Sequence, residues 1–303
     1  MVASYLAAAR AGTLRRVADA LEERLSLCRL CPHCCGAQRI QGDRGICRLG
    51  TEILVENAAP HFGEERPLVG AHGSGTIFFS SCNLACVFCQ NFEISHSRGG
   101  REVTPRQLAQ IMLHLQSLGC HNINCVTPTH VIAGIVRALE YAVPAGLTVP
   151  IVYNCGGYES VETLQLLEGV IDIYMPDIKY SSDMEARRYS GAPAYWERVQ
   201  EAVLEMHRQV GDLKLDSYGI AERGLVIRHL VMPGGIAGTS AVLDFIAHRI
   251  SLSSYVNVMD QYQPCFKAHK IPELCRPITR REYMEALVIA RRNGLSRGLP
   301  EGL

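Results

Sequence analysis

Short apolar runs alternate with longer amphipathic segments along most of the chain. Runs rich in β-branched and aromatic residues predict buried strands at residues 75–81, 122–127, 149–154, 171–177, 224–231 and 255–261. Apolar residues recur at helical spacing between and after these runs, at 105–118, 130–141, 160–167, 195–210, 240–250 and 279–293. Such alternation is typical of parallel strands covered by helices. Six units are two fewer than the usual eight, so the sequence predicts an α/β fold with a partial (β/α)6 TIM-like barrel, open on one side.

Two stretches depart from this alternation. Residues 14–27 have helical spacing and lead into a segment, 28–47, that is rich in cysteine, glycine and arginine. We therefore predict a small N-terminal helical and Cys-rich module over residues 1–60 and the partial barrel with its C-terminal helix over residues 61–303. Residues 212–223 contain the turn-forming sequence Asp216-Ser-Tyr-Gly219 and predict an inserted loop or hairpin.

Polar residues follow every predicted strand of the barrel. The carboxyl ends of parallel strands converge at one edge of a βα fold, and reactive groups collect there. The segments at this edge are Cys82, Thr127-Pro-Thr-His130, Asn154-Cys-Gly-Gly157, Asp177-Ile-Lys179, Arg228 with Met232-Pro-Gly-Gly235, and Gln261-Tyr-Gln-Pro264. We therefore predict a functional site at this edge.

Three cysteines, Cys82, Cys86 and Cys89, follow the first predicted strand with the spacing CxxxCxxC. Thiolates are the usual ligands of iron–sulfur clusters, and three of them leave one iron of a four-iron cluster with an open position. The alternatives are a helical stripe of small buried residues and a zinc ion with an open position. Three thiols beside the polar Asn83 and Gln90 would make a poor core, and zinc motifs usually pair distant CxxC elements. The pattern therefore favours a cluster.

Composition narrows the function classes. Thirty Lys and Arg balance thirty Asp and Glu, so no net charge or basic stripe indicates a nucleic-acid partner. No targeting segment and no apolar run of about 18 residues is present, which predicts a cytoplasmic protein without a membrane partner. Thirteen cysteines in such a chain favour metal or redox chemistry over a disulfide framework.

The CxxxCxxC motif, with Phe88 before its last cysteine, resembles the signature of the radical S-adenosylmethionine (SAM) superfamily. The resemblance implies a 4Fe-4S cluster on Cys82, Cys86 and Cys89, with SAM chelated to the fourth iron. It also implies that the reduced cluster cleaves SAM to methionine and a 5′-deoxyadenosyl radical, which abstracts hydrogen from a substrate. An electron donor such as flavodoxin or ferredoxin would then be a partner.

Several longer segments resemble a subgroup similar to pyruvate formate-lyase activating enzyme, whose own substrate is not settled. They are residues 73–79, 89–95, 122–130, 153–158, 174–180 and 227–234. The resemblance implies activation of a glycyl-radical enzyme or modification of another protein. An alternative is a radical SAM enzyme that acts on a small molecule, and an alternative of another class is a metal-binding regulator without turnover.

The resemblance also implies roles for individual side chains around SAM. Phe88 would lie beside the adenine ring, unless it is simply a core phenylalanine. Lys179 and Arg228, with Asp177, match the cations that bind the methionyl carboxylate. The alternative for these three residues is an internal ion-pair network between strand ends.

Four polar residues complete the predicted SAM site. Asn154 and Gln261 are candidates for the ribose hydroxyls or the carboxylate, with a loop-capping amide as the alternative for Asn154. In relatives a Gly-Gly-Glu stretch after the second strand holds the methionyl amino group. This chain has Thr127 and Thr129 in that place and so departs from the family pattern.

A second cysteine set, Cys28, Cys31, Cys34, Cys35 and Cys47, lies in the N-terminal module. Four sulfurs separated by glycine turns can close around one ion or cluster. A structural zinc is the leading interpretation, followed by an auxiliary iron–sulfur cluster and by a metal-free thiol set. The family resemblance implies Cys28, Cys31, Cys35 and Cys47 as the ligands, because Cys35 begins a Cys-Gly-x-x-Arg pattern.

Overall fold

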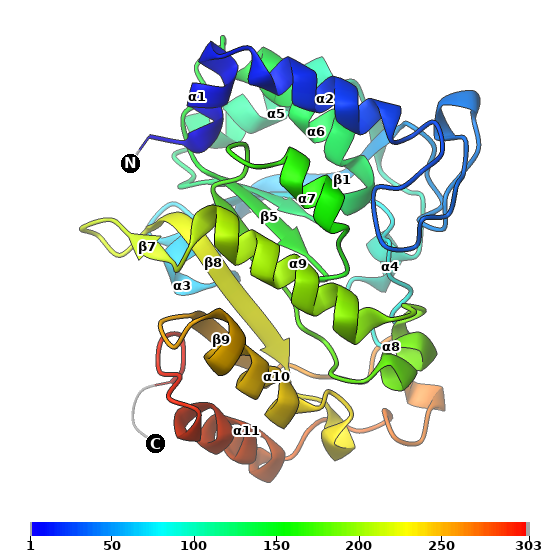
Figure 1. Cartoon of the computed structure of the whole chain (residues 1–303), viewed down its shortest axis with the longest axis vertical. Helices are drawn as coiled ribbons and strands as arrows, with labels where there is room; N and C mark the ends of the chain where they lie inside the picture. Colours follow the sequence, from blue (N-terminus) through cyan, green and yellow to red (C-terminus); the bar gives the residue numbers. More distant parts are fainter. Residues whose placement is uncertain (1, 301–303) are drawn as a thin grey trace.

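The computed structural model describes residues 2–300, which form a mixed α/β fold around one mostly parallel sheet (Figure 1). Six parallel strands run in the order β2, β4, β5, β6, β8 and β9. Their bounds are Ser74–Phe79, Ile123–Val126, Ile151–Cys155, Ile173–Pro176, Ala221–Leu230 and Tyr255–Met259. All six strands that the sequence predicted are present. The arrangement is consistent with the predicted partial barrel, because no pairing within residues 2–300 joins β9 to the other end of the sheet.

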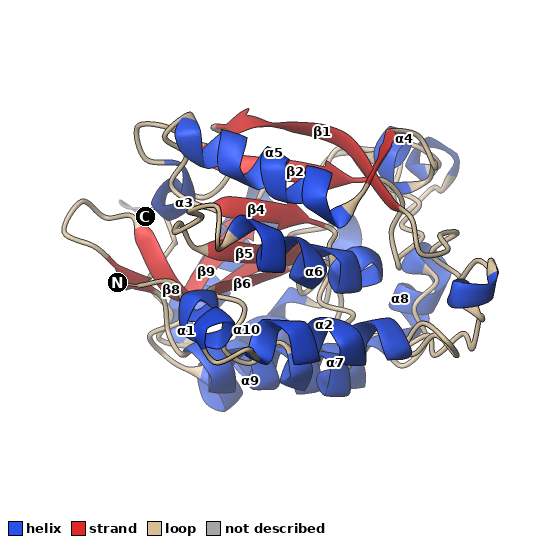
Figure 2. Cartoon of the chain, turned by 90° about the horizontal axis from the view of Figure 1, so that it is seen from above, coloured by secondary structure: helices blue, strands red, loops and turns tan. Residues whose placement is uncertain are grey.

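Helices cover the outside of the sheet (Figure 2). The predicted ones are α2 (Thr13–Glu23), α5 (Pro105–Ser117), α6 (Ile132–Ala142), α7 (Val161–Leu166), α9 (Tyr195–Val210), α10 (Thr239–Phe245) and α11 (Arg280–Arg292). Capping boxes at Thr104 and Thr279 begin α5 and α11, as their sequences lead one to expect. Of the helices in the described part, none combines the length and the apolar run that a membrane crossing requires.

Several elements were not predicted. The helices among them are α1 (Ser4–Arg10), α3 (Arg66–Val69), α4 (Phe92–Ser95) and α8 (Asp183–Ser190). Short 3-10 turns occur at Arg39–Gln41, Thr129–Val131, Pro233–Gly235 and Ala268–Lys270, and a π-helical turn, Ile246–Ile250, continues α10. The strand β7 (Lys214–Leu215) pairs with the start of β8 and forms the hairpin predicted at residues 212–223.

The N-terminal residues belong to the same body as the sheet. β1 (Ile53–His61) pairs antiparallel with β2 and with β3 (Arg101–Val103), so the boundary predicted between residues 60 and 61 falls inside a strand of the sheet. α2 packs on α6, where Arg137 bonds to Asp19 and Glu22. The first 60 residues are therefore built onto the barrel and are not a separate unit.

Candidate functional site

The CxxxCxxC segment leaves the carboxyl end of β2 and lines a cavity of about 250 Å³. Ser81, directly before the motif, has a φ of 73°, which side chains rarely adopt. Backbone strain of this kind persists where the surrounding structure holds it, and it clusters at functional sites. The sulfurs of Cys82, Cys86 and Cys89 all belong to residues that line the cavity. We refer to residues 82–91 as the cluster loop.

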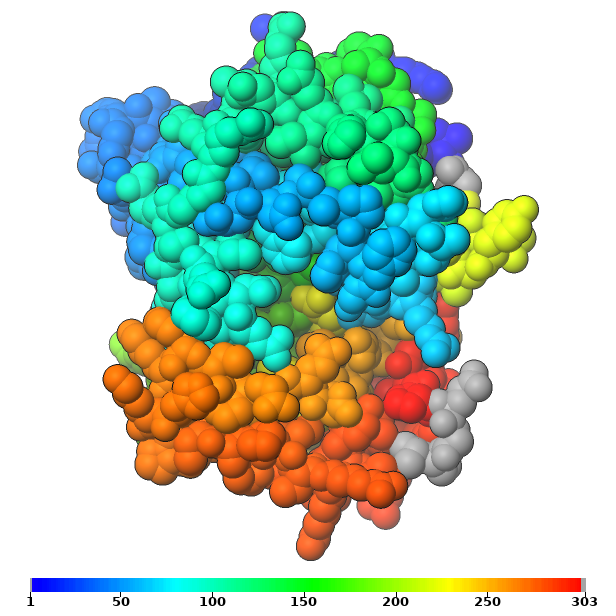
Figure 3. All heavy atoms as spheres, turned by 180° about the vertical axis from the view of Figure 1, so that it is seen from behind, coloured from blue at the N-terminus to red at the C-terminus, as the bar shows by residue number. Residues whose placement is uncertain are grey.

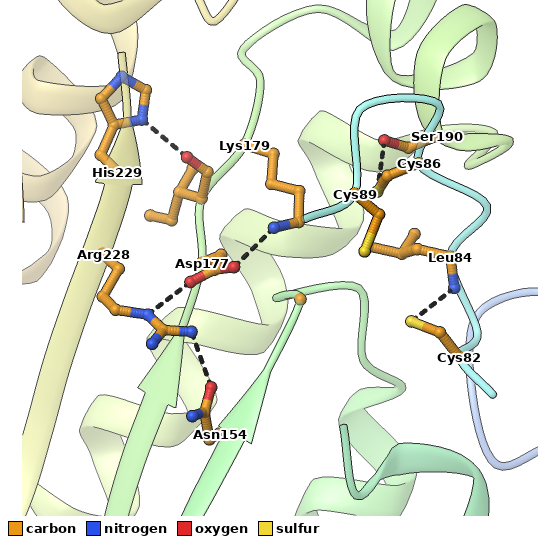
Figure 4. Close-up of polar contacts among 12 residues, drawn as sticks. Cys82, Leu84, Cys86, Cys89, Asn154, Asp177, Lys179, Ser190, Arg228 and His229 are labelled. Atoms are coloured by element: carbon orange, nitrogen blue, oxygen red, sulfur yellow. Dashed lines mark hydrogen bonds and ion pairs between the residues drawn. The ribbon is translucent and has the colours of Figure 1, made fainter. Parts of the chain in front are cut away.

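Each sulfur of the motif has a hydrogen-bond partner, and Figure 4 shows those of Cys82 and Cys86. The Leu84 N–H donates to Cys82 Sγ at 3.3 Å. Cys86 Sγ lies 3.0 Å from the Ser190 hydroxyl, and Cys89 Sγ lies 3.1 Å from the Ser95 hydroxyl. Burial raises the pKa of Cys86 to about 11, so without a metal this thiol keeps its proton at neutral pH.

The opposite wall of the cavity is charged. Asp177 accepts hydrogen bonds from Lys179 Nζ and Arg228 Nε, each at 2.6 Å. Arg228 Nη2 also donates to Asn154 Oδ1 at 2.7 Å (Figure 4). Its Nη1 lies 3.5 Å from Glu64. These side chains come from the ends of β5, β6 and β8 and from the loop after β1.

The charges of this wall support one another. Burial alone would raise the pKa of Asp177, but Arg228 and Lys179 outweigh it and hold that pKa below its usual value. Burial would likewise lower the pKa of Lys179, but the Asp177 carboxylate outweighs it and raises that pKa. At neutral pH two cations, Lys179 and Arg228, therefore surround the Asp177 carboxylate.

Glycine is required where the β5 loop meets the cluster loop and β6. A Cβ on Gly156 would lie 2.6 Å from Leu84 Cδ1, and a Cβ on Gly157 would lie 2.4 Å from the Asp177 carbonyl oxygen. Gly157 also has a φ of 75°. A larger residue at Gly157 would displace the backbone at Asp177, whereas one at Gly156 would require the Leu84 side chain to move.

Most of the predicted SAM-site residues meet at this cavity. Its lining includes Phe88, Thr127, Asn154, Asp177, Lys179, Arg228 and Gln261. Phe88 is 5% exposed, and its ring lies 6.0 Å from that of Tyr262, so it is both a cavity wall and part of an aromatic cluster.

The prediction for Thr129 is wrong. Thr129 begins a 3-10 turn, is fully buried outside the cavity, and donates its hydroxyl proton to Glu159 Oε1 at 2.8 Å. The chain turns at Thr127, whose φ is 59°, and this turn carries Thr129 away from the cavity edge.

Sequence reasoning missed two serines and one glutamate. Ser190 ends α8, about a hundred positions from the cysteine that it contacts, and no sequence signal marks it. Ser95 lies close to the motif, so proximity alone could have suggested it. Glu159 is 2% exposed and accepts hydrogen bonds from the neutral side chains of Thr129, Tyr153 and Cys155, and its burial raises its pKa to about 7.

The predicted N-terminal ligands also come together, outside this cavity. Cys28 hydrogen-bonds with Cys35, and the sulfurs of Cys35 and Cys47 each lie 3.3 Å from the point where a Cβ on Gly45 would stand. Cys31 is close enough to Cys28 and Cys47 for a negative charge on either to raise its pKa, although burial is the larger cause. Cys34, the one cysteine of this set that was not predicted to be a ligand, is exposed.

Neither cysteine set is a preformed site for one metal ion. Within residues 2–300, no group of three or more His, Cys, Asp or Glu side chains is placed to hold an ion. A zinc ion at Cys28, Cys31, Cys35 and Cys47, the leading interpretation from sequence, would have to draw these sulfurs together. Zinc at the CxxxCxxC motif would require the same movement.

Comparisons with known proteins give a family match and two similar proteins. A model of the radical SAM superfamily matches residues 76–222. The uncharacterized protein MJ0674 of Methanocaldococcus jannaschii is 33% identical over 278 residues, which cover 88% of this chain and 75% of that protein. Among solved structures, the structure of TYW1 with a lysine-pyruvate adduct bound is similar over 73% of this chain and 74% of that chain. The identity is 10% and the TM-score is 0.44.

Proposed function

The chain belongs to the radical SAM superfamily of iron–sulfur, SAM-binding enzymes, and from this premise we propose that Cys82, Cys86 and Cys89 hold its 4Fe-4S cluster. The donor set fits that group. The three cysteines of the motif line one cavity, and a fourth cysteine of its lining, Cys155, is hydrogen-bonded to Glu159. Within the described residues the lining contains no histidine and only one carboxylate, Asp177. Because Asp177 is already bound by Lys179 and Arg228, and Cys155 by Glu159, no other cysteine, histidine or carboxylate of the lining is left over for the fourth iron. This arrangement is the observation that carries the proposal.

Lys179 is the best candidate for binding the methionyl carboxylate of SAM. An ammonium has three N–H donors, and the structure pairs one of them with Asp177, which leaves two for a ligand. Arg228 is instead engaged with Asp177, Asn154 and Glu64. We assign to Arg228 the role of holding Asp177 and Asn154 in place, in the network that the sequence left open as an alternative.

The bound cluster would supply the electron that cleaves SAM to methionine and a 5′-deoxyadenosyl radical. The chain's own contribution is to position SAM and keep water away. Lys179 orients its carboxylate, and Phe88 offers an aromatic face to the adenine. Leu84, Leu230 and Met259 give the cavity apolar walls, which favour hydrogen transfer from the substrate over side reactions.

We propose a protein as the substrate, through activation of a glycyl-radical enzyme or another protein modification. Seen from behind, the molecule has a hollow between the cyan part of the chain and the orange segment that follows β9, with green and yellow parts of the sheet at its base (Figure 3). An open side of this kind would admit a loop of another protein. The relation to pyruvate formate-lyase activating enzyme rests on the sequence motifs alone and stays a prediction.

A small-molecule substrate is the second candidate. The segment after β9 lies over the cluster loop: Lys267 N–H donates to the Val87 carbonyl, and the rings of Phe266 and Phe92 stack 5.2 Å apart. A segment anchored in this way would shield a small substrate from solvent. Cells grown in deuterated medium provide an extract whose protein fraction and small-molecule filtrate can each be incubated with the reduced enzyme and unlabelled SAM. The fraction that contains the substrate should transfer deuterium to 5′-deoxyadenosine, which separates the two candidates.

The test of the enzyme proposal is reductive cleavage of SAM. Protein reconstituted without oxygen should bind iron and sulfide and form 5′-deoxyadenosine with SAM and dithionite. Cys86→Ala should form none, and Cys275→Ser, which changes an exposed thiol outside the cavity, should behave as wild type. A wild-type protein that binds iron without any SAM cleavage would instead support a metal-binding regulator. Flavodoxin or ferredoxin, as the proposed physiological donor, should replace dithionite.

A further inference from the structure

We infer that the hydroxyls of Ser95 and Ser190 raise the reduction potential of the cluster by donating hydrogen bonds to Cys89 and Cys86. This inference rests on the proposed function, because it takes these cysteines as cluster ligands. Neither serine was expected from the sequence motifs, and neither is a ligand. Both are therefore positioning residues that act through the sulfurs.

The contacts are short and protected from solvent. Ser190 is fully buried, and its Oγ lies 3.0 Å from Cys86 Sγ. Ser95 is 8% exposed, and its Oγ lies 3.1 Å from Cys89 Sγ. In such surroundings water cannot replace a missing hydroxyl easily, so each hydrogen bond has a larger electrostatic effect than it would in solvent.

The direction of both hydrogen bonds follows from the chemistry of the ligands. A cysteine that binds iron is a thiolate, which has no proton and can only accept. Ser190 Oγ also lies 2.8 Å from the Tyr180 hydroxyl, within hydrogen-bond distance. If Tyr180 gives its proton to Ser190, the Ser190 proton remains available for Cys86. The Ser95 hydroxyl has Cys89 as its partner in the described part of the chain.

Donors at the sulfurs favour the reduced cluster. In the one-electron reduction, with dithionite as the electron donor in vitro, the cluster and its sulfurs gain negative charge and no bond is broken. A hydrogen bond to a more negative acceptor is stronger, so each hydroxyl stabilises the reduced state more than the oxidised one. Hydrogen bonds to the sulfurs are among the factors that set the potential of such clusters.

The two serines are held by different parts of the chain. Ser190 is fixed at the end of α8, where its carbonyl accepts the Ala85 N–H. The Ser95 carbonyl accepts a hydrogen bond from Arg48, which follows Cys47 of the N-terminal cysteine set and also contacts the Ser81 hydroxyl at 3.1 Å. The N-terminal module therefore orients the donor at Cys89, and α8 provides the donor at Cys86.

The test is a redox titration of the cluster, followed by electron paramagnetic resonance, in protein reconstituted without SAM. Ser95→Ala and Ser190→Ala should each shift the midpoint potential to a more negative value without loss of iron. The shifts should add in the double variant, because the serines contact different sulfurs. Ser95→Thr and Ser190→Thr keep the hydroxyl and should restore most of the wild-type potential.

Two further variants make the test specific. Ser97→Ala removes a hydroxyl that donates to the Ile94 carbonyl and not to a sulfur, so the potential should not change. Arg48→Ala should shift the potential in the same direction as Ser95→Ala and should add little to it, because it acts through Ser95.

An unchanged potential in both alanine variants, with iron retained, would overturn the inference. If Ser190→Ala does not hold iron, Ser95→Ala decides alone by the same criterion. Iron content and SAM cleavage of the wild type are measured first. A wild type without a cluster would defeat the proposed function, whereas a normal wild type with insensitive variants would defeat only this inference.

Discussion

The two cysteine sets of this molecule have similar spacing in sequence but different surroundings. Cys82, Cys86 and Cys89 line a cavity whose cationic wall is already balanced by Asp177. The N-terminal set lies around Arg39, a guanidinium that is 2% exposed and donates to the carbonyls of Gly50 and His130. Arg39 Nη1 also lies 3.7 Å from Cys28 Sγ. None of these three partners of Arg39 is a carboxylate.

This difference indicates which of the two cysteine sets is suited to catalytic turnover. A buried cation without a carboxylate partner favours thiolates beside it, and Arg39 is among the groups that lower the pKa of Cys35 against the opposing effect of burial. The N-terminal set is therefore our proposed place for a permanent metal or cluster, which would also have to overcome the burial that raises the pKa of Cys31 and Cys47. Cys82, Cys86 and Cys89 instead face a cavity and the Lys179 ammonium, which has N–H donors free for a ligand. Such an arrangement suits a site that binds and releases a ligand.

The largest effect should come from breaking the charged wall. Arg228→Met leaves the buried Asp177 and Glu64 without their main cation, which should lower the free energy of unfolding by about 3 to 5 kcal/mol. Denaturant unfolding of the apo protein measures this. Arg281→Met removes an exposed ion pair and should cost less than about 1 kcal/mol. Equal losses in the two variants would contradict the account of the wall.

A pH effect on stability should come from Glu159. It lies beside Cys155 of the cavity lining and near Cys31 of the N-terminal set. Burial raises its pKa in the folded protein to about 7, so its contribution is fully present at low pH and is lost as pH rises through about 7. The free energy of unfolding of the wild type should therefore fall with rising pH. In Glu159→Gln this fall should be smaller by on the order of 3 kcal/mol. Urea titrations at pH 5 and pH 8 check it, and a wild-type stability that does not fall between them would argue against a neutral buried Glu159.

Lys179→Met tests the ligand side of the comparison. Loss of a charged donor to the SAM carboxylate should weaken SAM binding roughly tenfold to a hundredfold. Equilibrium dialysis on the reconstituted protein measures the change, with Lys214→Met in the exposed strand β7 as the matched control. The assignment of Lys179 would not survive an affinity equal to that of the control.

The smallest effect on SAM cleavage should come from the N-terminal set. Cys31→Ser should reduce total metal content while the spectrum of the CxxxCxxC cluster persists. Cys34→Ser, which changes the exposed neighbour, should alter neither. Metal analysis and visible absorption distinguish these outcomes. Equal loss of both signals in Cys31→Ser would show that the two cysteine sets depend on each other.

The sequence predicted the six parallel strands and most of the cavity because both follow from local patterns. Apolar runs mark strands buried on both faces, and the ends of parallel strands must converge. β1 escaped prediction because Glu56 and Asn57 interrupt its apolar run and its partners lie on both sides in the sheet.

The errors at the site have a common physical cause. The position of Thr129 depends on a strained turn at Thr127, and the position of Ser190 depends on where a short polar helix packs against the cluster loop. Such contacts are decided by tertiary packing, which leaves no periodic signal in the sequence. The sequence predicted which residues form the charged wall but not how they pair. Arg228 binds Asp177, and Lys179 keeps N–H donors free for a ligand.

The most direct test of the central claim is the electron paramagnetic resonance spectrum of the reduced protein with and without SAM. If three cysteines leave one iron for SAM, adding SAM should change the spectrum of the wild type, and Lys179→Met should need a higher SAM concentration for the same change. Identical spectra with and without saturating SAM, in protein that carries a full cluster, would contradict the account.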